Sequence, residues 1–349
     1  MILCFMTIGN EHSHKNQKTD PQLHNKSKGK YFDEVCLCLY LDEFAASRVF
    51  AEVPAEGWEE IAALIKQGVS AGKFLCPYSV EQMIESSGLD RMSASFLDNE
   101  TRKFSSGWCF YNEADISANY LICRVRQTKM QKHHFIHQDQ QTRLGKSDVY
   151  EEIGKLNETF RQMIKEAAHS VNIIREAARN GSRGKKDTRD FLVKQIKNDY
   201  TEELQKRMFW LGYYGSYDPA PITLAGLDLL FWADEVSRIL TGKHFMTQIE
   251  AQSAFWVLEK EGIDAVPSLS IRASLEAMIA YKGTIETPND QMDILRIAGA
   301  LPFADIMLID GAKAHDVREL KLDKKFQTNI YSGKKKDLEN LRELLTDLL

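Results

Sequence analysis

Two short apolar segments, far apart in the chain, each end in an aspartate. The first is VCLCLYL, residues 35–41, which is followed by Asp42 and Glu43. The second is DIMLID, residues 305–310, which ends at Asp310. Runs this apolar are typical of strands buried on both faces of a parallel sheet. Parallel strands place their carboxyl ends at one edge, where open α/β sheets bind ligands, so both acids are predicted to lie at that edge.

The elements that follow the first strand are those of an α/β protein. Residues 58–72 have the apolar spacing of a helix that ends near Gly72. FLCP, residues 74–77, is predicted to be a short strand closed by its proline, and a further helix is predicted from Ser79 to Gly88. This strand–helix–strand–helix order favours a parallel α/β sheet.

The composition is that of an ordinary globular protein. The chain has 349 residues, which is enough for one large domain or two smaller ones. Its net charge of −5 argues against a protein whose whole surface binds nucleic acid, but leaves room for a local basic patch. The six cysteines show no CxxC spacing, and no apolar run is long enough to span a membrane. We therefore expect a cytoplasmic protein with reduced thiols.

The character of the sequence changes along the chain. Residues 1–30 are mostly polar and are expected to form a disordered tail, whereas residues 31–95 are expected to form the first part of the α/β domain. Residues 96–280 are dominated by charged, helix-favouring segments and are predicted to be a mainly helical insertion. One of its predicted helices is LDLLFWADEVSRILTG, residues 227–242. Residues 281–349 return to an α/β pattern and are predicted to complete the domain.

The helices next to the two strands carry further acids. The helix before DIMLID has to start at the ligand-binding edge to deliver the chain to the opposite edge, and its first turn contains Asp290 and Asp293. The helix after FLCP also starts at that edge and carries Glu81 and Glu85, which are four residues apart and share a face. Asp305 begins its strand roughly 16 Å from the far end, so it is a poor partner for these acids.

This topology predicts a cluster of carboxylates at one edge of the sheet. Four carboxylates within a few ångströms repel one another strongly unless a hard divalent cation lies between them. Mg²⁺ or Mn²⁺ held in this way activates water and stabilises charge on a phosphate oxygen. Each acid also has an ordinary structural interpretation, as a helix cap, a first-turn dipole partner, a turn residue or part of a solvated face. Their convergence on one edge favours a functional site.

Four stretches together resemble the PIN-domain nucleases. They are LDEF after the first strand, CPYSVEQMIES, NDQMDILRIAGALPFADIMLID, and a terminal strand and helix, so the resemblance covers residues 34–88 and about 286–349. It implies an α/β/α sandwich with a central parallel sheet and a metal-dependent active site of three or four acids. It further implies an endonuclease that cuts RNA, or single-stranded DNA, to leave 5′-phosphate and 3′-hydroxyl ends, with a toxin-like or antiviral role by analogy.

The resemblance places the catalytic, metal-binding acids at four positions of this chain. They are Asp42, Glu85, Asp293 and Asp310, with Glu81 as the alternative to Glu85 and Asp290 adjacent to Asp293. The chain departs from the family in the length of the helical block at residues 96–280. We expect this block to grip substrate, to form a homodimer or to bind a regulatory partner.

Other polar and aromatic stretches are weaker candidates. Basic runs are usually solvated faces, but they are the best phosphate contacts on an acidic chain: Arg183, Lys185 and Lys186 in GSRGKK, the run LDKK, and Lys334, Lys335 and Lys336 in SGKKK. His133, His134 and His137 have metal-ligand spacing, although an exposed basic stretch is the favoured interpretation. The stretch WLGYYG, residues 210–215, is expected to pack between helices rather than to stack on bases.

Two rival functions remain compatible with the sequence. The first rival to the nuclease is a catalytically silent PIN-like scaffold whose insertion binds a partner. The second is a metal-dependent phosphoesterase that acts on small substrates. The absence of GxxxxGK[ST], GxGxxG and GxSxG motifs gives no support to a P-loop, a Rossmann cofactor site or an α/β-hydrolase.

Overall fold

The computed structural model describes most of the chain. The described residues are 36–51, 54–79, 81–82, 91–138, 186–216, 222–224, 227–229, 231–284 and 286–349. The predicted N-terminal tail therefore lies outside the described residues, as do residues 139–185 within the predicted insertion.

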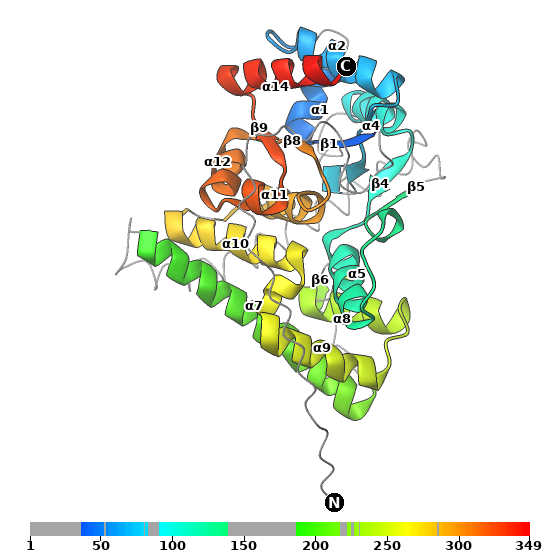
Figure 1. Ribbon diagram of the computed structural model, residues 1–349, viewed down its shortest axis with the longest axis vertical. Helices are drawn as coiled ribbons and strands as arrows, with labels where there is room; N and C mark the ends of the chain where they lie inside the picture. The colour runs from blue at the N-terminus through cyan, green and yellow to red at the C-terminus, as the bar shows by residue number, and fades with distance from the viewer. Residues whose placement is uncertain are drawn as a thin grey trace, which may run out of the picture.

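A four-stranded parallel sheet forms the centre of the α/β part, as the sequence predicted. Its strand order is β2 (Phe74–Leu75), β1 (Leu37–Leu41), β8 (Ile306–Leu308) and β9 (Asn329–Tyr331). The two acid-terminated segments are immediate neighbours, with β1 pairing in parallel with β8 in the register Leu41 to Leu308. The first and last parts of the chain thus share one sheet (Figure 1).

A second sheet continues from the first. Only Cys76 and Pro77 separate β2 from β3 (Tyr78–Ser79), so the predicted stop at the proline is a passage into another sheet. Strand β3 pairs in parallel with β4 (Trp108–Phe110), which pairs antiparallel with β5 (Ile136–Gln138). Helix α4 (Arg91–Ser105) precedes β4, so the expected boundary between residues 95 and 96 falls inside a helix.

One predicted helix is wrong in its first part. Within residues 227–242, β7 (Leu227–Leu229) pairs with β6 (Ile222–Leu224), and helix α8 begins only at Trp232 and ends at Gly242. The run LDLLF is apolar and short, and periodicity alone does not distinguish a strand from a helix over such a length.

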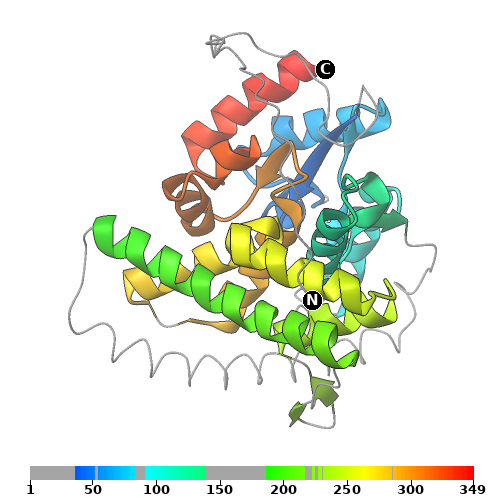
Figure 2. The same ribbon diagram turned by 60° about the horizontal axis from the view of Figure 1, so that its bottom comes forward.

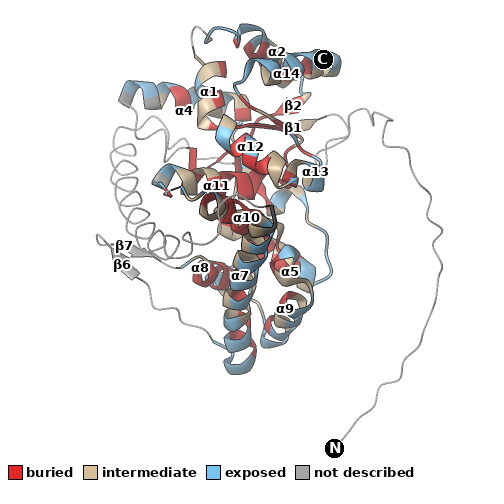
Figure 3. Cartoon of the chain, turned by 90° about the vertical axis from the view of Figure 1, so that its left-hand side faces the viewer, coloured by how far each residue is buried: buried red, intermediate tan, exposed pale blue. Residues whose placement is uncertain are grey.

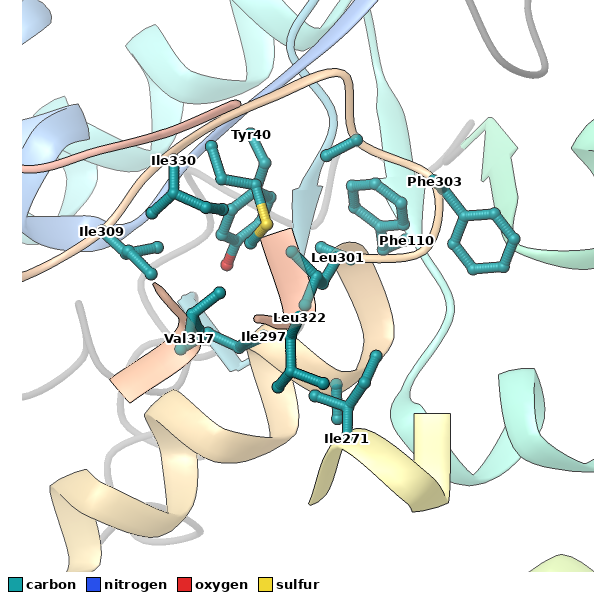
Figure 4. Close-up of a cluster of buried hydrophobic side chains, with 14 of the residues drawn as sticks. Tyr40, Phe110, Ile271, Ile297, Leu301, Phe303, Ile309, Val317, Leu322 and Ile330 are labelled. Carbon is teal, nitrogen blue, oxygen red and sulfur yellow. The ribbon is translucent and has the colours of Figure 1, made fainter. Parts of the chain in front are cut away.

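Apolar side chains cover both faces of the parallel sheet. Alternate residues of β1 point to opposite faces, so Tyr40 belongs to one hydrophobic cluster and Leu39 to another. The Tyr40 cluster packs against α11 (Pro288–Ala300) and α12 (Gly311–Glu319), and Figure 4 shows Tyr40 with Ile297, Ile309 and Val317. The Leu39 cluster packs against α1 (Glu43–Val49), α2 (Glu59–Ser70), α4 and α14 (Lys335–Leu348).

The remaining helices form a third hydrophobic cluster beside the sheet. It is built by α5 (Glu113–Val125), α7 (Lys186–Tyr214), α8, α9 (Gln248–Glu261) and α10 (Pro267–Lys282). Helix α7 and its neighbours lie across one end of the molecule (Figure 2), and α10 is mostly buried between them and α11 (Figure 3). The shorter elements are η1 (Lys132–His134), η2 (Gly262–Ala265) and α13 (Leu322–Phe326). Among the described helices, none is long and apolar enough to cross a membrane.

We predict that Gly68→Ala destabilises the fold. A Cβ atom at Gly68 on α2 would lie 2.0 Å from Cδ2 of the buried Phe74 ring on β2, so the ring would have to move. The free energy of unfolding should fall by about 1–3 kcal/mol, measured by urea denaturation. Gly242→Ala is the matched control because a Cβ there meets nothing within 4 Å, and its stability should stay within about 1 kcal/mol of wild type. Equal stability of both variants would contradict the close helix–strand contact.

Candidate active site

The parallel sheet reverses its winding direction between β1 and β8. From β1 the chain continues to β2 on one side, whereas β8 continues to β9 on the other, so the crevice beyond β1 and β8 is the topological switch point where α/β sheets bind ligands. Asp42 directly follows β1, and Asp310 follows β8 by two residues. The backbone N–H of Asp310 donates to Oδ2 of Asp42 at 2.9 Å. The two predicted acids therefore meet at the switch point.

Both acids also cap helices. Oδ1 of Asp42 accepts the N–H of Ala45 at 2.9 Å and begins α1, and Oδ1 of Asp310 accepts the N–H of Ala312 at 2.7 Å and begins α12. The structural interpretation of these residues is therefore correct as far as it goes. An ionised carboxylate has about four lone-pair sites, so these bonds leave each side chain able to accept further hydrogen bonds or bind a cation.

Helix α11 adds a third acid to the same place. A small pocket lies beyond the ends of β1 and β8 and contains Asp293 as well as Asp42 and Asp310. The structure thus brings together three of the predicted residues, by the connectivity that the sequence suggested. Asp305 binds the N–H of Cys38 at 2.8 Å, four residues before Asp42, and so lies at the opposite end of the sheet as expected. The full lining of the pocket is Tyr40, Asp42, Asp293, Arg296, Ile297, Ile309, Asp310 and Lys313.

Two cations in this pocket were not singled out from the sequence. Arg296, whose side chain is 3% exposed, forms an ion pair with Asp293 one turn earlier on α11. Lys313, whose side chain is 8% exposed, donates from Nζ to Oδ1 of Asp290 at 2.7 Å. Their signal in the sequence was their spacing, since Arg296 follows Asp293 by three residues and Lys313 follows Asp310 by three.

The environment of Asp42 changes its acidity. The pKa of Asp42 is raised to about 7, chiefly by burial and also by the nearby charges of Asp293 and Asp310, against the opposing effects of Arg296 and the Ala45 N–H. Burial also raises the pKa of Asp290, but hydrogen bonds from Lys313 and Thr287 outweigh it and bring the pKa below its usual range. Asp42 in the pocket is therefore half protonated near neutral pH, whereas Asp290, which binds the pocket residue Lys313 from outside the lining, stays ionised.

Glu81 lies close to the same edge. It follows β3 and is 8% exposed, and burial raises its pKa while the charge of Arg296 lowers it. The side chain of its neighbour Gln82 donates to the carbonyl oxygen of Leu41, the residue before Asp42, so this turn sits against the end of β1. Glu85 lies outside the described residues, and the choice between the two glutamates stays a prediction.

The donors of the pocket suit a hard divalent cation, but their present arrangement does not enclose one. Carboxylate oxygens are the ligands that Mg²⁺ and Mn²⁺ prefer. In the described part of the chain, however, no group of three or more Asp, Glu, His or Cys residues is placed so that it could hold a metal ion. Arg296 and Lys313 instead neutralise Asp293 and Asp290. The carboxylate donors are of the kind that the metal prefers, but in the described structure they are not arranged to hold it.

The predicted histidine cluster is not a metal site in the described structure. Nδ1 of His134 accepts the N–H of Gln131 at 2.9 Å, and the ring of His137 stacks on Tyr111 with centroids 4.5 Å apart. Neighbouring His133 lies beside His134 in η1, where the two ring centroids are 4.0 Å apart. Only His133 is exposed, whereas His134 and His137 are partly buried, so the favoured interpretation as an exposed basic stretch holds for His133 alone.

The C-terminal basic run lies next to the pocket. Lys334, Lys335 and Lys336 are exposed at the amino end of α14, and Cε of Lys334 lies 3.5 Å from where a Cβ on Gly311 would be. Gly311 directly follows Asp310, so Lys334 borders the acidic crevice. In the other runs, Arg183 and Lys185 lie outside the described residues, Lys186 begins α7, and Lys325 pairs with Asp264.

The aromatic stretch at the end of α7 does not pack between helices. Trp210, Tyr213 and Tyr214 are 47%, 68% and 55% exposed, whereas Met208 and Leu211 on the opposite face of α7 are buried. The expectation of helix packing is therefore wrong for the three aromatic residues. The inner face of α7 was already filled by its aliphatic side chains.

Comparison with known proteins gave no match to a family model, to a curated protein or to a solved structure.

We predict that Asp42→Asn flattens the pH dependence of stability of the metal-free protein. Between pH 3.8 and about 7 the folded protein keeps a proton on Asp42 that the unfolded chain releases. Its contribution to stability is full below that window and is lost as the pH rises through it, by up to about 1.4 kcal/mol per pH unit. Asparagine does not titrate, so this part of the slope should disappear in urea denaturation at several pH values. An unchanged slope would contradict the shifted pKa.

Proposed function

We propose that this protein is a metal-dependent endonuclease that hydrolyses phosphodiester bonds, with RNA as its substrate. The observation that carries the proposal is the meeting of Asp42 and Asp310, joined by a backbone hydrogen bond, at the switch point of a parallel sheet. Asp293 of α11 lines the same pocket. Each of these acids also has a structural role of its own, as a helix cap or an ion-pair partner, and a shared ligand would explain why all three line one pocket.

The fold supports a PIN-like domain. Hydrophobic clusters cover the two faces of the parallel sheet, which is what a three-layer α/β/α sandwich requires. In the sequence, the helical block lies between the two parts of the chain that supply the parallel sheet. In space, its helix α10 packs against α11 on one side of that sheet. We infer from these features and the resemblance in sequence that the domain is a PIN-like sandwich with a large helical insertion.

The residues of the pocket suit a reaction at a phosphate group. Asp42, Asp293 and Asp310 would hold one or two Mg²⁺ or Mn²⁺ ions, with Glu81 or Glu85 as the fourth acid. A bound divalent ion activates water and offsets charge on the phosphate oxygens. The chain itself supplies rigidity, because the hydrogen bonds from Ala45 and Asp310 fix the Asp42 carboxylate before substrate binds. Its burial keeps bulk water from weakening these interactions.

The lysine run provides a place for the phosphate backbone. Lys334, Lys335 and Lys336 surround the positive end of the α14 dipole, where cations weaken a helix and anions stabilise it. Such a placement is unfavourable for the helix alone, and a bound phosphate would reverse the penalty. Lys334 also borders Gly311 beside Asp310, so a strand bound there would lead into the pocket.

One observation favours the scaffold alternative. Arg296 and Lys313 already neutralise acids around the pocket, so the site is electrostatically tolerable without a metal ion. A catalytically silent PIN-like scaffold would have the same ion pairs. The two functions differ in what the acids do when Mn²⁺ and nucleic acid are present.

The double variant Asp42→Asn/Asp310→Asn should lose at least about 100-fold in cleavage rate on labelled RNA with Mn²⁺ or Mg²⁺. Wild-type cleavage should stop when EDTA removes the metal. Asp305→Asn is the matched control, because it changes an aspartate of the same strand at the opposite end of the sheet. Its activity should stay close to wild type.

The outcomes of this assay separate the candidate functions. Metal-dependent cleavage of RNA that the double variant lacks supports the nuclease, and single-stranded DNA serves as the competing substrate. Turnover of a nitrophenyl phosphoester with RNA left intact would instead support a small-molecule phosphoesterase. Cleavage that persists in the double variant would place the activity elsewhere, and a wild-type protein without any cleavage would support the scaffold.

Replacing the three lysines by alanine should weaken RNA binding and its dependence on salt. Each phosphate contact to a single strand contributes about 0.7 to the slope of log K against log salt, so the slope should shrink by up to about 2. Fluorescence anisotropy with an uncleavable RNA in Ca²⁺ measures this. A control triple variant removes exposed lysines elsewhere: Lys103, Lys129 and Lys260. Equal effects of the two triple variants would show that only net charge matters.

A further inference from the structure

Lys313 occupies an unusual position for a lysine. Lys313 belongs to the first turn of α12 and is only 6% exposed. It lines the same pocket as Asp42, Asp293 and Asp310. Its Nζ donates to Oδ1 of Asp290 at 2.7 Å, and its backbone N–H donates to Oδ1 of Asp310. Burying an ammonium group costs free energy unless an opposite charge is paired with it, and here the Asp290 carboxylate supplies that charge.

The other cation of the pocket is bound more firmly. Arg296 is 4% exposed and pairs with Asp293, and its charge also acts on Asp42 and Glu81 from the centre of the site. A guanidinium group with several acids around it is a fixed part of the structure, whereas a lysine ammonium on a four-carbon stem changes partner easily. Of the two cations, Lys313 is therefore the one that can move.

The partner of Lys313, Asp290, is held in position by other hydrogen bonds as well. Oδ2 of Asp290 accepts from the N–H and the hydroxyl of Thr287 at 2.9 and 2.7 Å, in the capping box that begins α11. Oδ1 is the oxygen that receives Lys313. The capping box holds the carboxylate in place whether or not the lysine is bound, so its release does not require α11 to unwind.

We propose that Lys313 is an exchangeable counter-ion of the active site, which pairs with Asp290 without metal and contacts a phosphate oxygen of the substrate once a divalent cation has entered. The inference rests on the proposed nuclease function and deepens it. The Lys313 side chain lines the pocket whose acids would hold the divalent cation, so the two positive charges would repel each other and weaken the ion pair of Lys313 with Asp290. Displaced from Asp290, the ammonium remains in the pocket, where an anionic phosphate is its natural partner.

The test combines metal binding with kinetics. Mn²⁺ is titrated calorimetrically into the RNA-free protein, and cleavage of labelled RNA is measured at saturating Mn²⁺. In Lys313→Met the Kd for Mn²⁺ should fall about five- to tenfold, since the competing charge is gone. The kcat/KM for RNA should fall about 10- to 100-fold in the same variant, because the phosphate contact is lost. If Lys313 had only a structural role, its replacement by methionine would not make Mn²⁺ bind more tightly.

A second lysine–aspartate pair, which also involves helix α12, provides the matched control. Lys282 of α10 pairs with the buried Asp316 of α12, but neither residue lines the pocket. Lys282→Met should change stability without changing the Kd for Mn²⁺ or kcat/KM. If Lys313→Met does not fold, Lys313→Gln removes the charge while its amide still reaches Asp290, and the same two changes are expected.

The results distinguish failure of the inference from failure of the proposed function. Unchanged or weaker Mn²⁺ binding in Lys313→Met and Lys313→Gln, with a wild type that binds Mn²⁺ and cleaves RNA, would overturn the exchange and leave the nuclease standing. A wild-type protein that neither binds Mn²⁺ nor cleaves RNA would overturn the proposed function and the exchange together. Equal shifts in Lys282→Met would show that the effect is not specific to the pocket, and would also overturn it.

Discussion

The hydrogen bond from the Asp310 backbone to the Asp42 carboxylate joins the two parts of the chain that make the candidate site. It closes the parallel pairing of β1 and β8 at its carboxyl end, where Asp42 also donates its own N–H to Leu308. The same carboxylate begins α1 through Ala45, while Asp310 begins α12. The pocket therefore depends on the correct register of two strands separated by more than 260 residues.

Around this junction the protein balances buried charge within a small space. Burial and the acidic neighbours raise the pKa of Asp42 to about 7. Arg296 and Lys313 form ion pairs with Asp293 and Asp290. These ion pairs compensate buried charge, and Asp42, Asp293 and Asp310 still line one pocket. In the proposed function a metal ion would need carboxylates that already cap helices or form ion pairs. The proposed exchange of Lys313 is one way in which the entry of a divalent cation would be accommodated.

The helical block is coupled to the site through packing. Helix α10 contacts both the third hydrophobic cluster and α11, the helix that carries Asp293 and Arg296. A partner bound to the helical block would act on the pocket through contacts such as those of α10 with α11, since interiors this closely packed transmit displacement. The exposed aromatic residues at the end of α7 lie on the face of that helix opposite its contacts within the block.

The sequence by itself determined the parallel sheet, the two acid-terminated strands and their common edge, because strand direction and connectivity follow from apolar runs and helix order. It also correctly placed Asp293 at the edge of the sheet that carries the pocket and Asp305 at the opposite edge. Only the tertiary structure decided that β6 and β7 form a hairpin, and that Trp210, Tyr213 and Tyr214 face outward. It alone revealed Arg296 and Lys313 between the acids. Such choices depend on which side chains fill the space between elements, and that space exists only after the chain has folded.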